Sequence, residues 1–301
     1  MRDPLDCYDP VAQRRYAYAR DAAKDGDHAA AAEVLEQALE WAPEWAAAWF
    51  ALGEARERLG AAQAAAAAFR ATLRLDPVDA QGASARLALI EGRETAALPP
   101  AYIARLFDDY APCFEAHLSS ELAYRGPELI VAALDRIAPA RQFACAFDIG
   151  CGTGLMAMAL RDRVDRFFGV DLSAKMVAKA LQSGLYEALE VGDAVEFLSK
   201  QAQSADLIVA ADVLVYFGDL DPIFVGARRA LTRGGLFAFS VEAGEGEGYQ
   251  LRPTMRFAHS EPYLRAAAAR AGLVPTDIHA AATRREAGGE VAGWIAVFRA
   301  A

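Results

Sequence analysis

The stretch Phe147-Asp148-Ile149-Gly150-Cys151-Gly152-Thr153-Gly154 decides the fold of this 301-residue chain. An apolar run ends in an acid, and glycines then occupy alternate positions before the helical pattern of 155–160. This order predicts a strand, a tight turn and a helix start, because only residues without a Cβ turn so sharply and let a ligand lie against the backbone. Leu155 stands where a dinucleotide fingerprint needs its third glycine, so that fingerprint is not met.

Two further apolar runs end in acids at regular intervals. Asp171 follows Asp148 by 23 residues, and Asp193 follows Asp171 by 22 residues. Helical patterns over 173–181 and 194–200 come after them. Each acid alone could simply cap a helix, but acids at the carboxyl ends of successive parallel strands face one crevice, where open α/β sheets bind ligands. The spacing therefore favours a shared site, in which a carboxylate can accept hydrogen bonds from a ribose diol.

These motifs resemble those of class I S-adenosylmethionine-dependent methyltransferases. The resemblance implies an α/β fold with a Rossmann-like seven-stranded sheet and an antiparallel last strand. It also implies that S-adenosyl-L-methionine is the cofactor, released as S-adenosyl-L-homocysteine, with Asp171 on the ribose. The full set of cofactor-binding residues that it implies is Asp148, Gly150, Cys151, Gly152, Gly154, Asp171, Leu172, Met176, Asp193, Ala194, Ala211, Asp212 and Tyr110.

The rest of the second half continues this pattern. Residues 206–216 predict a fourth strand and its exit loop, and 231–240 predict a turn and a fifth strand. The alternating segments 274–281 and 291–299 suit an antiparallel hairpin that closes the sheet. Residues 242–260 alternate glycines with acids at their start, which predicts an irregular loop bordering the substrate side.

The first hundred residues follow a different period. Pro43 and Pro77 are 34 residues apart, and aligning them superposes Leu35 on Phe69. This resembles tetratricopeptide repeats, in which small residues let paired helices approach closely. Residues 79–91 would form a third, capping helix. The tryptophans near the first proline are expected to pack between repeats; these are Trp41, Trp45 and Trp49.

The sequence therefore predicts two domains. Residues 1–98 would form a small all-α domain of tetratricopeptide-like repeats, and residues 99–301 the methyltransferase domain. Within the latter, 99–140 would form lid helices and 141–301 the Rossmann-like core. The sequence of residues 102–118 resembles the helical lid that many small-molecule methyltransferases place over their cofactor. The whole chain resembles predicted methyltransferases with N-terminal tetratricopeptide repeats.

The amino-acid composition argues against several classes of partner, location and site. The formal net charge is −10, which would repel a phosphate backbone, so no nucleic-acid partner is expected. No apolar run reaches 18 residues, so no membrane span is expected, and residues 1–4 lack the apolar segment of a signal peptide. The cysteines show no Cys-x-x-Cys pairing and the histidines are scattered, which predicts reduced thiols, a cytoplasmic location and no metal site.

Methyl transfer chiefly requires alignment of donor and acceptor, with a general base where the acceptor loses a proton. The candidate catalytic side chains are His259, His117 and Tyr216. The expected acceptor is an oxygen or nitrogen on a small molecule or peptide-like substrate, with a possible protein partner for the repeats. Two alternatives remain open: an NAD-dependent oxidoreductase, and a repeat scaffold with a non-catalytic, nucleotide-sensing methyltransferase-like domain.

Overall fold

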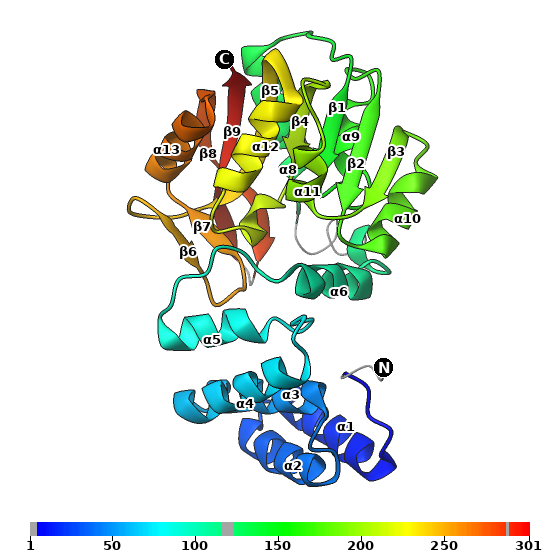
Figure 1. The fold of residues 1–301 in the computed structure, drawn as a ribbon, viewed down its shortest axis with the longest axis vertical. Helices are drawn as coiled ribbons and strands as arrows, with labels where there is room; N and C mark the ends of the chain where they lie inside the picture. Colours follow the sequence, from blue (N-terminus) through cyan, green and yellow to red (C-terminus); the bar gives the residue numbers. More distant parts are fainter. Residues whose placement is uncertain (1–4, 116–122, 287–288) are drawn as a thin grey trace. The chain divides into compact units, whose positions relative to one another are not determined.

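The computed structural model describes residues 5–115, 123–286 and 289–301. The chain divides into two compact units, Met1–Tyr102 and Ile103–Ala301 (Figure 1). The sequence predicts the domain boundary four residues earlier, between residues 98 and 99, and that boundary stays a prediction. Within the described ranges, no helix combines the length and the apolar character that crossing a bilayer needs.

The first unit consists of antiparallel helix pairs, as the 34-residue period predicts. Its helices are α1 (Pro10–Lys24), α2 (His28–Trp41), α3 (Ala46–Arg58), α4 (Ala62–Leu75) and α5 (Ala83–Glu91). Helix α1 packs on α2, and α3 packs on α4. The equivalent positions Leu35 and Phe69 are both buried. Helix α5 begins four residues later than expected, because the Asp79 carboxylate caps it by accepting from Ala83 N at 2.6 Å and Ser84 N at 3.0 Å.

The tryptophans of the first repeat do not share one environment. Trp45 is buried, and its ring lies 4.5 Å from the ring of Tyr16. Trp49 is partly buried. Trp41 is 55% exposed, so the expectation that it packs between repeats is wrong. Trp41 is the last residue of α2, and the guanidinium carbon of Arg15 in α1 lies 5.7 Å from the centre of its ring.

The second unit contains the predicted α/β sheet. The order β3-β2-β1-β4-β5 is parallel throughout, β9 pairs antiparallel with β5, and β8 pairs antiparallel with β9. The strands are β1 (Ala146–Ile149), β2 (Phe167–Asp171), β3 (Tyr186–Val191), β4 (Ala205–Ala210), β5 (Leu231–Ala243), β8 (Leu273–Glu286) and β9 (Gly289–Ala300). The predicted Rossmann-like sheet with an antiparallel end is thereby confirmed.

Two short strands arise where the sequence predicts only a loop. Strand β6 (Tyr249–Leu251) pairs with β7 (Phe257–His259), and β7 pairs in parallel with the end of β5. The described sheet therefore has nine strands, two more than predicted. The alternating glycines and acids occupy only the turn before β6. The strand pair itself is stabilised by the aromatic rings of Tyr249 and Phe257, whose centroids lie 5.9 Å apart.

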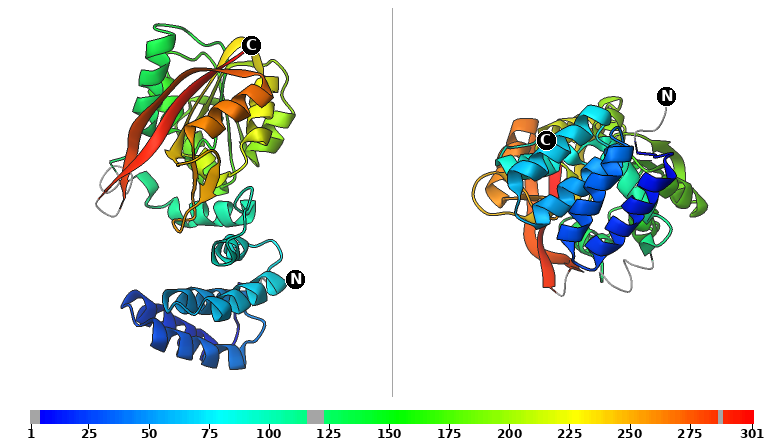
Figure 2. Two further views of the ribbon diagram at one scale, coloured as in Figure 1. Left: turned by 90° about the vertical axis from the view of Figure 1, so that its left-hand side faces the viewer. Right: turned by 90° about the horizontal axis from the view of Figure 1, so that it is seen from below.

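Helices cover both faces of the sheet (Figure 2, left). On one face, α8 (Gly126–Ile137) and α9 (Leu155–Leu160) enclose an apolar core with alternate strand residues. On the other face lie α11 (Ala194–Ser199), α12 (Asp221–Ala230) and α13 (Glu261–Ala271). Helix α8, which lies in the segment 99–140 predicted to form lid helices, packs against β5, β8 and β9 and so belongs to the cover of the sheet. The remaining elements are α6 (Pro100–Tyr110), α10 (Ala174–Gln182) and the 3₁₀ turn η1 (Leu214–Tyr216).

Candidate functional site

The glycine turn lies at the carboxyl end of β1. Gly152 has a φ of 54°, and a Cβ built there would meet no atom within 4 Å. The hydroxyl of the neighbouring Thr153 is buried and has no hydrogen-bond partner within the described residues. Open space beside Gly152, next to an unsatisfied hydroxyl, fits a ligand that lies directly against this turn.

Asp171 faces the same turn from the end of β2. Its Oδ2 accepts from Gly152 N at 2.9 Å and its Oδ1 accepts from Ser173 N at 2.8 Å. Burial raises the pKa of this carboxyl, and the two backbone donors act against that shift. The two N–H groups fix the orientation of the carboxylate, while a second lone pair on each oxygen can accept from a ligand diol.

Asp148 is the most deeply buried of the three strand-end acids. Its Oδ2 accepts from the Tyr186 hydroxyl at 2.6 Å. Tyr186 begins β3 and reaches Asp148 across Gly169, which pairs with Asp148 in the sheet. A Cβ at Gly169 would come within 2.9 Å of the Tyr186 ring, so the glycine leaves the path open. Burial raises the pKa of Asp148 to about 7, although the tyrosine hydrogen bond opposes the shift.

The other residues predicted to contact the cofactor differ in their burial and in their hydrogen-bond partners. Asp193 caps α11, because its Oδ1 accepts from Val195 N at 2.8 Å and Glu196 N at 3.0 Å. Met176 has no exposed surface, so a cofactor cannot contact it in this arrangement. Cys151 is buried and burial raises the pKa of its thiol, which keeps it protonated. Partly buried positions around the sheet's carboxyl edge are Leu172, Ala211 and Tyr110, whereas Ala194 is buried.

A buried ion network lies past the end of β4. Asp212 has a φ of 60°, and both of its carboxylate oxygens accept from Arg284 Nη1 at 3.0 Å. The Arg284 side chain, only 1% exposed, also donates from Nη2 to the buried Glu242. Ser240 Oγ accepts from Asp212 N at 2.8 Å. Side chains from β5 and β8 therefore hold the loop that follows β4.

The arginines of the β6–β7 turn are part of the same network. Arg252 Nη1 lies 3.3 Å from Glu242 Oε2, and Arg256 Nη1 lies 2.8 Å from Glu286 Oε2. Tyr216 lies beside Arg256, and burial raises the pKa of its phenol to about 12. At neutral pH Tyr216 is therefore a hydrogen-bond donor, and it does not act as a base.

The structure argues against His259 as a general base. Its side chain has no exposure, and its Nε2 lies 2.8 Å from Phe217 O and 3.2 Å from Gly218 O. Burial lowers the pKa of this histidine to about 4. The ring is therefore neutral and donates from Nε2 to the main chain after η1, out of a substrate's reach. The second histidine candidate, His117, lies outside the described residues.

Sequence reasoning missed three side chains at this edge: Tyr186, Arg284 and Tyr124. Tyr124 lies close enough to Asp212, Arg284 and Asp148 for their charges to act on it, and burial is the main reason that its pKa is raised. Arg125 N, next in the chain, donates to Thr283 O at 2.8 Å, which ties this segment to β8. No local signal singles out Arg284, because the next two residues, Arg285 and Glu286, are also charged.

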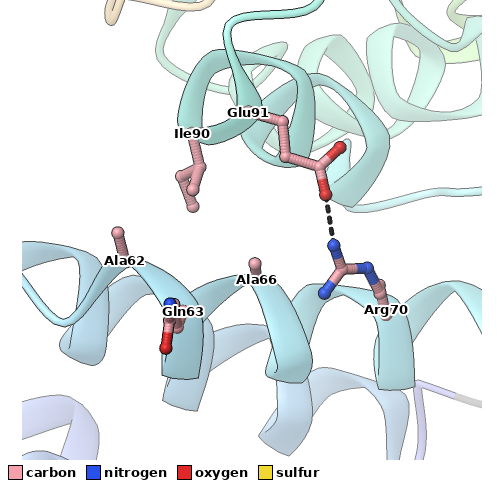
Figure 3. A pocket seen from close by; sticks show the side chains of 6 residues that line it. All are labelled: Ala62, Gln63, Ala66, Arg70, Ile90 and Glu91. Atoms are coloured by element: carbon pink, nitrogen blue, oxygen red, sulfur yellow. Dashed lines mark hydrogen bonds and ion pairs between the residues drawn. The ribbon is translucent and has the colours of Figure 1, made fainter.

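The repeat unit has a hollow of its own between α4 and α5 (Figure 3). It is lined by Ala62, Gln63, Ala66, Arg70, Ile90 and Glu91. Arg70 and Glu91 form an ion pair across it. The rest of the lining is two alanines, one glutamine and one isoleucine, so these residues offer no hydroxyl, thiol or imidazole group for catalysis.

Comparisons with known proteins agree with this geometry. Residues 147–239 match the family model of a methyltransferase domain, and residues 15–44 and 46–79 match that of the tetratricopeptide repeat. The chain combines tetratricopeptide repeats with a methyltransferase domain. The methyltransferase match contains the glycine turn and the three strand-end acids, and the repeat matches contain helices α2 to α4 and the part of α1 from residue 15 on.

Among curated relatives, the malonyl-[acyl-carrier protein] O-methyltransferase of Enterobacter lignolyticus is 28% identical over 54% of this chain and 61% of its own length. The mitochondrial arginine-hydroxylase NDUFAF5 of Mus musculus is 29% identical over 40% of this chain and 35% of its own. The chain thus spans about three fifths or less of these two relatives. The structure of 1,6-didemethyltoxoflavin-N1-methyltransferase from Burkholderia thailandensis covers 69% of this chain and 92% of its own, with 18% identity and a TM-score of 0.53, which shows a shared fold.

Proposed function

We propose that this chain is an S-adenosyl-L-methionine-dependent methyltransferase. The observation that carries the proposal is the open backbone at Gly152, which donates to Asp171 inside a matched methyltransferase domain. S-Adenosyl-L-methionine supplies a methyl group on a sulfonium, and its transfer leaves S-adenosyl-L-homocysteine and a proton from the acceptor. Asp171 would accept from the ribose, Gly150 to Gly154 would line the donor, and Asp193 with Ala194 would border the adenine.

The acceptor is proposed to be an oxygen or nitrogen on a small molecule or peptide-like group. It would enter beside Asp212 and Tyr216, where the exit loop of β4 faces the donor crevice. The ion pairs of Arg252 and Arg256 leave this side with balanced charge, which suits a neutral or weakly charged acceptor better than a polyanion. The protein's main contribution would be to align donor and acceptor.

Both alternatives are less favoured. An NAD-dependent oxidoreductase would need a third glycine where Leu155 opens α9, and the relatives include O-methyltransferases. A non-catalytic scaffold is less favoured because residues 147–239 match a methyltransferase domain and the relatives include O-methyltransferases. A nucleotide sensor would keep the same carboxylates at the glycine turn, so the assay of methyl transfer separates the two.

The proposal also covers the location of the enzyme and its partners. The four cysteines are free thiols, which is consistent with a reducing cytoplasm. The two repeat matches support a protein partner bound by the first unit. A nucleic-acid partner is not expected, because acids outnumber bases by ten.

Calorimetric titration of the full chain with S-adenosyl-L-homocysteine, and in parallel with NAD, tests the cofactor. We expect saturable binding of the first ligand and none of the second. A preference for NAD would contradict the proposal. Incubation with labelled S-adenosyl-L-methionine and fractionated extract, with malonyl-acyl carrier protein as a defined acceptor, then tests the reaction. Donor binding without label transfer to any fraction would favour the scaffold.

A further inference from the structure

Helix α6 touches both sides of the crevice through adjacent residues. The ring of Phe107 packs edge-on against Tyr216, with centroids 5.7 Å apart and planes at 87°. Asp108 Oδ1 accepts from the hydroxyl of Ser173 at 2.6 Å and from Lys175 N at 3.1 Å. One contact is therefore with the exit of β4 and the other with the loop that follows β2.

The order of the strands fixes what lies between these two contacts. β2 and β4 pair with opposite edges of β1, and the glycine turn follows β1 directly. A helix that contacts the exits of both β2 and β4 must therefore cross the carboxyl end of β1. Figure 1 shows α6 at this end of the sheet.

The contact of Asp108 continues into the donor site through hydrogen bonds. Ser173 is the N-cap of α10, and its Oγ accepts from Met176 N at 3.1 Å. Its own N–H donates to Asp171 Oδ1, and Asp171 Oδ2 accepts from Gly152 N. Asp108 is thus joined through two residues to the open backbone where a ligand would lie.

We infer that Asp108 is a positioning residue that fixes α6 across the donor crevice and couples this helix to the Asp171 carboxylate. The inference rests on the proposed function. While Asp108 holds Ser173, α6 covers the glycine turn, and departure of the spent donor requires this contact to break. Product release from covered sites often limits turnover, so the contact sets the rate of that step.

Three single variants test this assignment. Asp108→Ala removes the acceptor for both hydrogen bonds, whereas Asp108→Asn keeps a carbonyl oxygen at Oδ1 and should restore them. Asp109→Ala is the matched control, because the neighbouring Asp109 side chain is 72% exposed and its ion pair with Arg105 is long, at 3.9 Å.

The measurements are dissociation of S-adenosyl-L-homocysteine by stopped flow and hydrogen exchange of residues 103–110 in the ligand-free full chain. For Asp108→Ala we expect dissociation and local exchange each to rise by about tenfold, because both hydrogen bonds to Oδ1 are lost. Asp108→Asn and Asp109→Ala should stay within about twofold of the unaltered protein, by the same conversion.

Faster exchange in Asp108→Ala without faster dissociation would overturn the inference, since Asp108 would then only stabilise the helix. Unchanged exchange would overturn it as well. If the unaltered protein binds no S-adenosyl-L-homocysteine, the proposed function fails by itself. In that case the exchange arm still decides whether Asp108 holds α6.

Discussion

The proposed donor and acceptor sides of the crevice are built in different ways. On the donor side, Asp148, Gly152 and Asp171 lie within 24 residues of sequence, and main-chain N–H groups orient Asp171. On the acceptor side, Asp212 and Arg284 come from segments 72 residues apart and are held by side-chain charges. The donor side should therefore respond most to changes of shape, and the acceptor side to removal of charge.

The largest effect should come from removing the central charge of the acceptor side. Arg284→Met would leave Glu242 buried and would remove the nitrogen that donates to both carboxylate oxygens of Asp212. Breaking a buried ion pair at one partner costs about 3–5 kcal/mol, so the free energy of unfolding should fall by about that amount. Urea unfolding measures it, with the exposed neighbour Arg285→Met as control. Equal stability of the two variants would show that the network is not the acceptor side's main support.

A change of shape on the donor side should abolish binding while sparing the fold. The Cβ of Gly152→Val would project into open space, so the new side chain would occupy the volume meant for the donor. We expect affinity for S-adenosyl-L-homocysteine to fall by more than about 100-fold, equivalent to about 2.7 kcal/mol. Gly184→Val is the control, since Gly184 also has a positive φ, at 67°, and open space around it, but follows α10.

If Gly184→Val weakened binding as much as Gly152→Val, the loss would come from backbone strain. A loss confined to Gly152→Val, with similar melting temperatures for the two variants, would place the ligand at the glycine turn.

This contrast also explains what the sequence could predict. The strand ends at Asp171 and the cap at Ser173 follow from local patterns, because a turn and a helix start depend on neighbouring residues. Arg284 could not be assigned a partner, since its contacts with Asp212 and Glu242 depend on how β8 lies beside β9 and β5. His259 was misjudged for the same reason: pairing of β7 with β5 buries a residue that its sequence context placed in a loop.

Truncating Asp171, the acid proposed to bind the ribose, should have an intermediate effect. Asp171→Ala removes a charged acceptor, and such hydrogen bonds contribute about 1.5–3 kcal/mol. Calorimetry should therefore show S-adenosyl-L-homocysteine binding weakened by roughly 10- to 150-fold. Asp162→Ala, at a side chain that is 88% exposed, is the control. Unchanged affinity in Asp171→Ala would remove this residue from the donor site.

The smallest predicted effect concerns the hydrogen bond from Tyr186 to Asp148. With a pKa of about 7, Asp148 gains charge as the pH rises through neutrality. An ionised carboxylate attracts the cationic groups of S-adenosyl-L-methionine, so affinity should rise with pH across this range. The tyrosine hydrogen bond lowers the pKa of Asp148, because it stabilises the charged form. Tyr186→Phe removes it, and the midpoint of the affinity profile should move to higher pH.

The expected size of this shift follows from the free energy that one hydrogen bond contributes. A net contribution of about 0.5–1.5 kcal/mol corresponds to a shift of up to roughly one pH unit. The ligand's own amino group also titrates near neutrality, but it does so equally for both proteins, so the difference between their profiles isolates Asp148. Calorimetry between about pH 6 and 9 measures it, with Tyr18→Phe, at a 63% exposed tyrosine of the repeat unit, as control. The two profiles should converge above both midpoints, because Asp148 is then ionised in either protein. A midpoint that stays in place or moves to lower pH would mean that Tyr186 does not set the charge of the donor side.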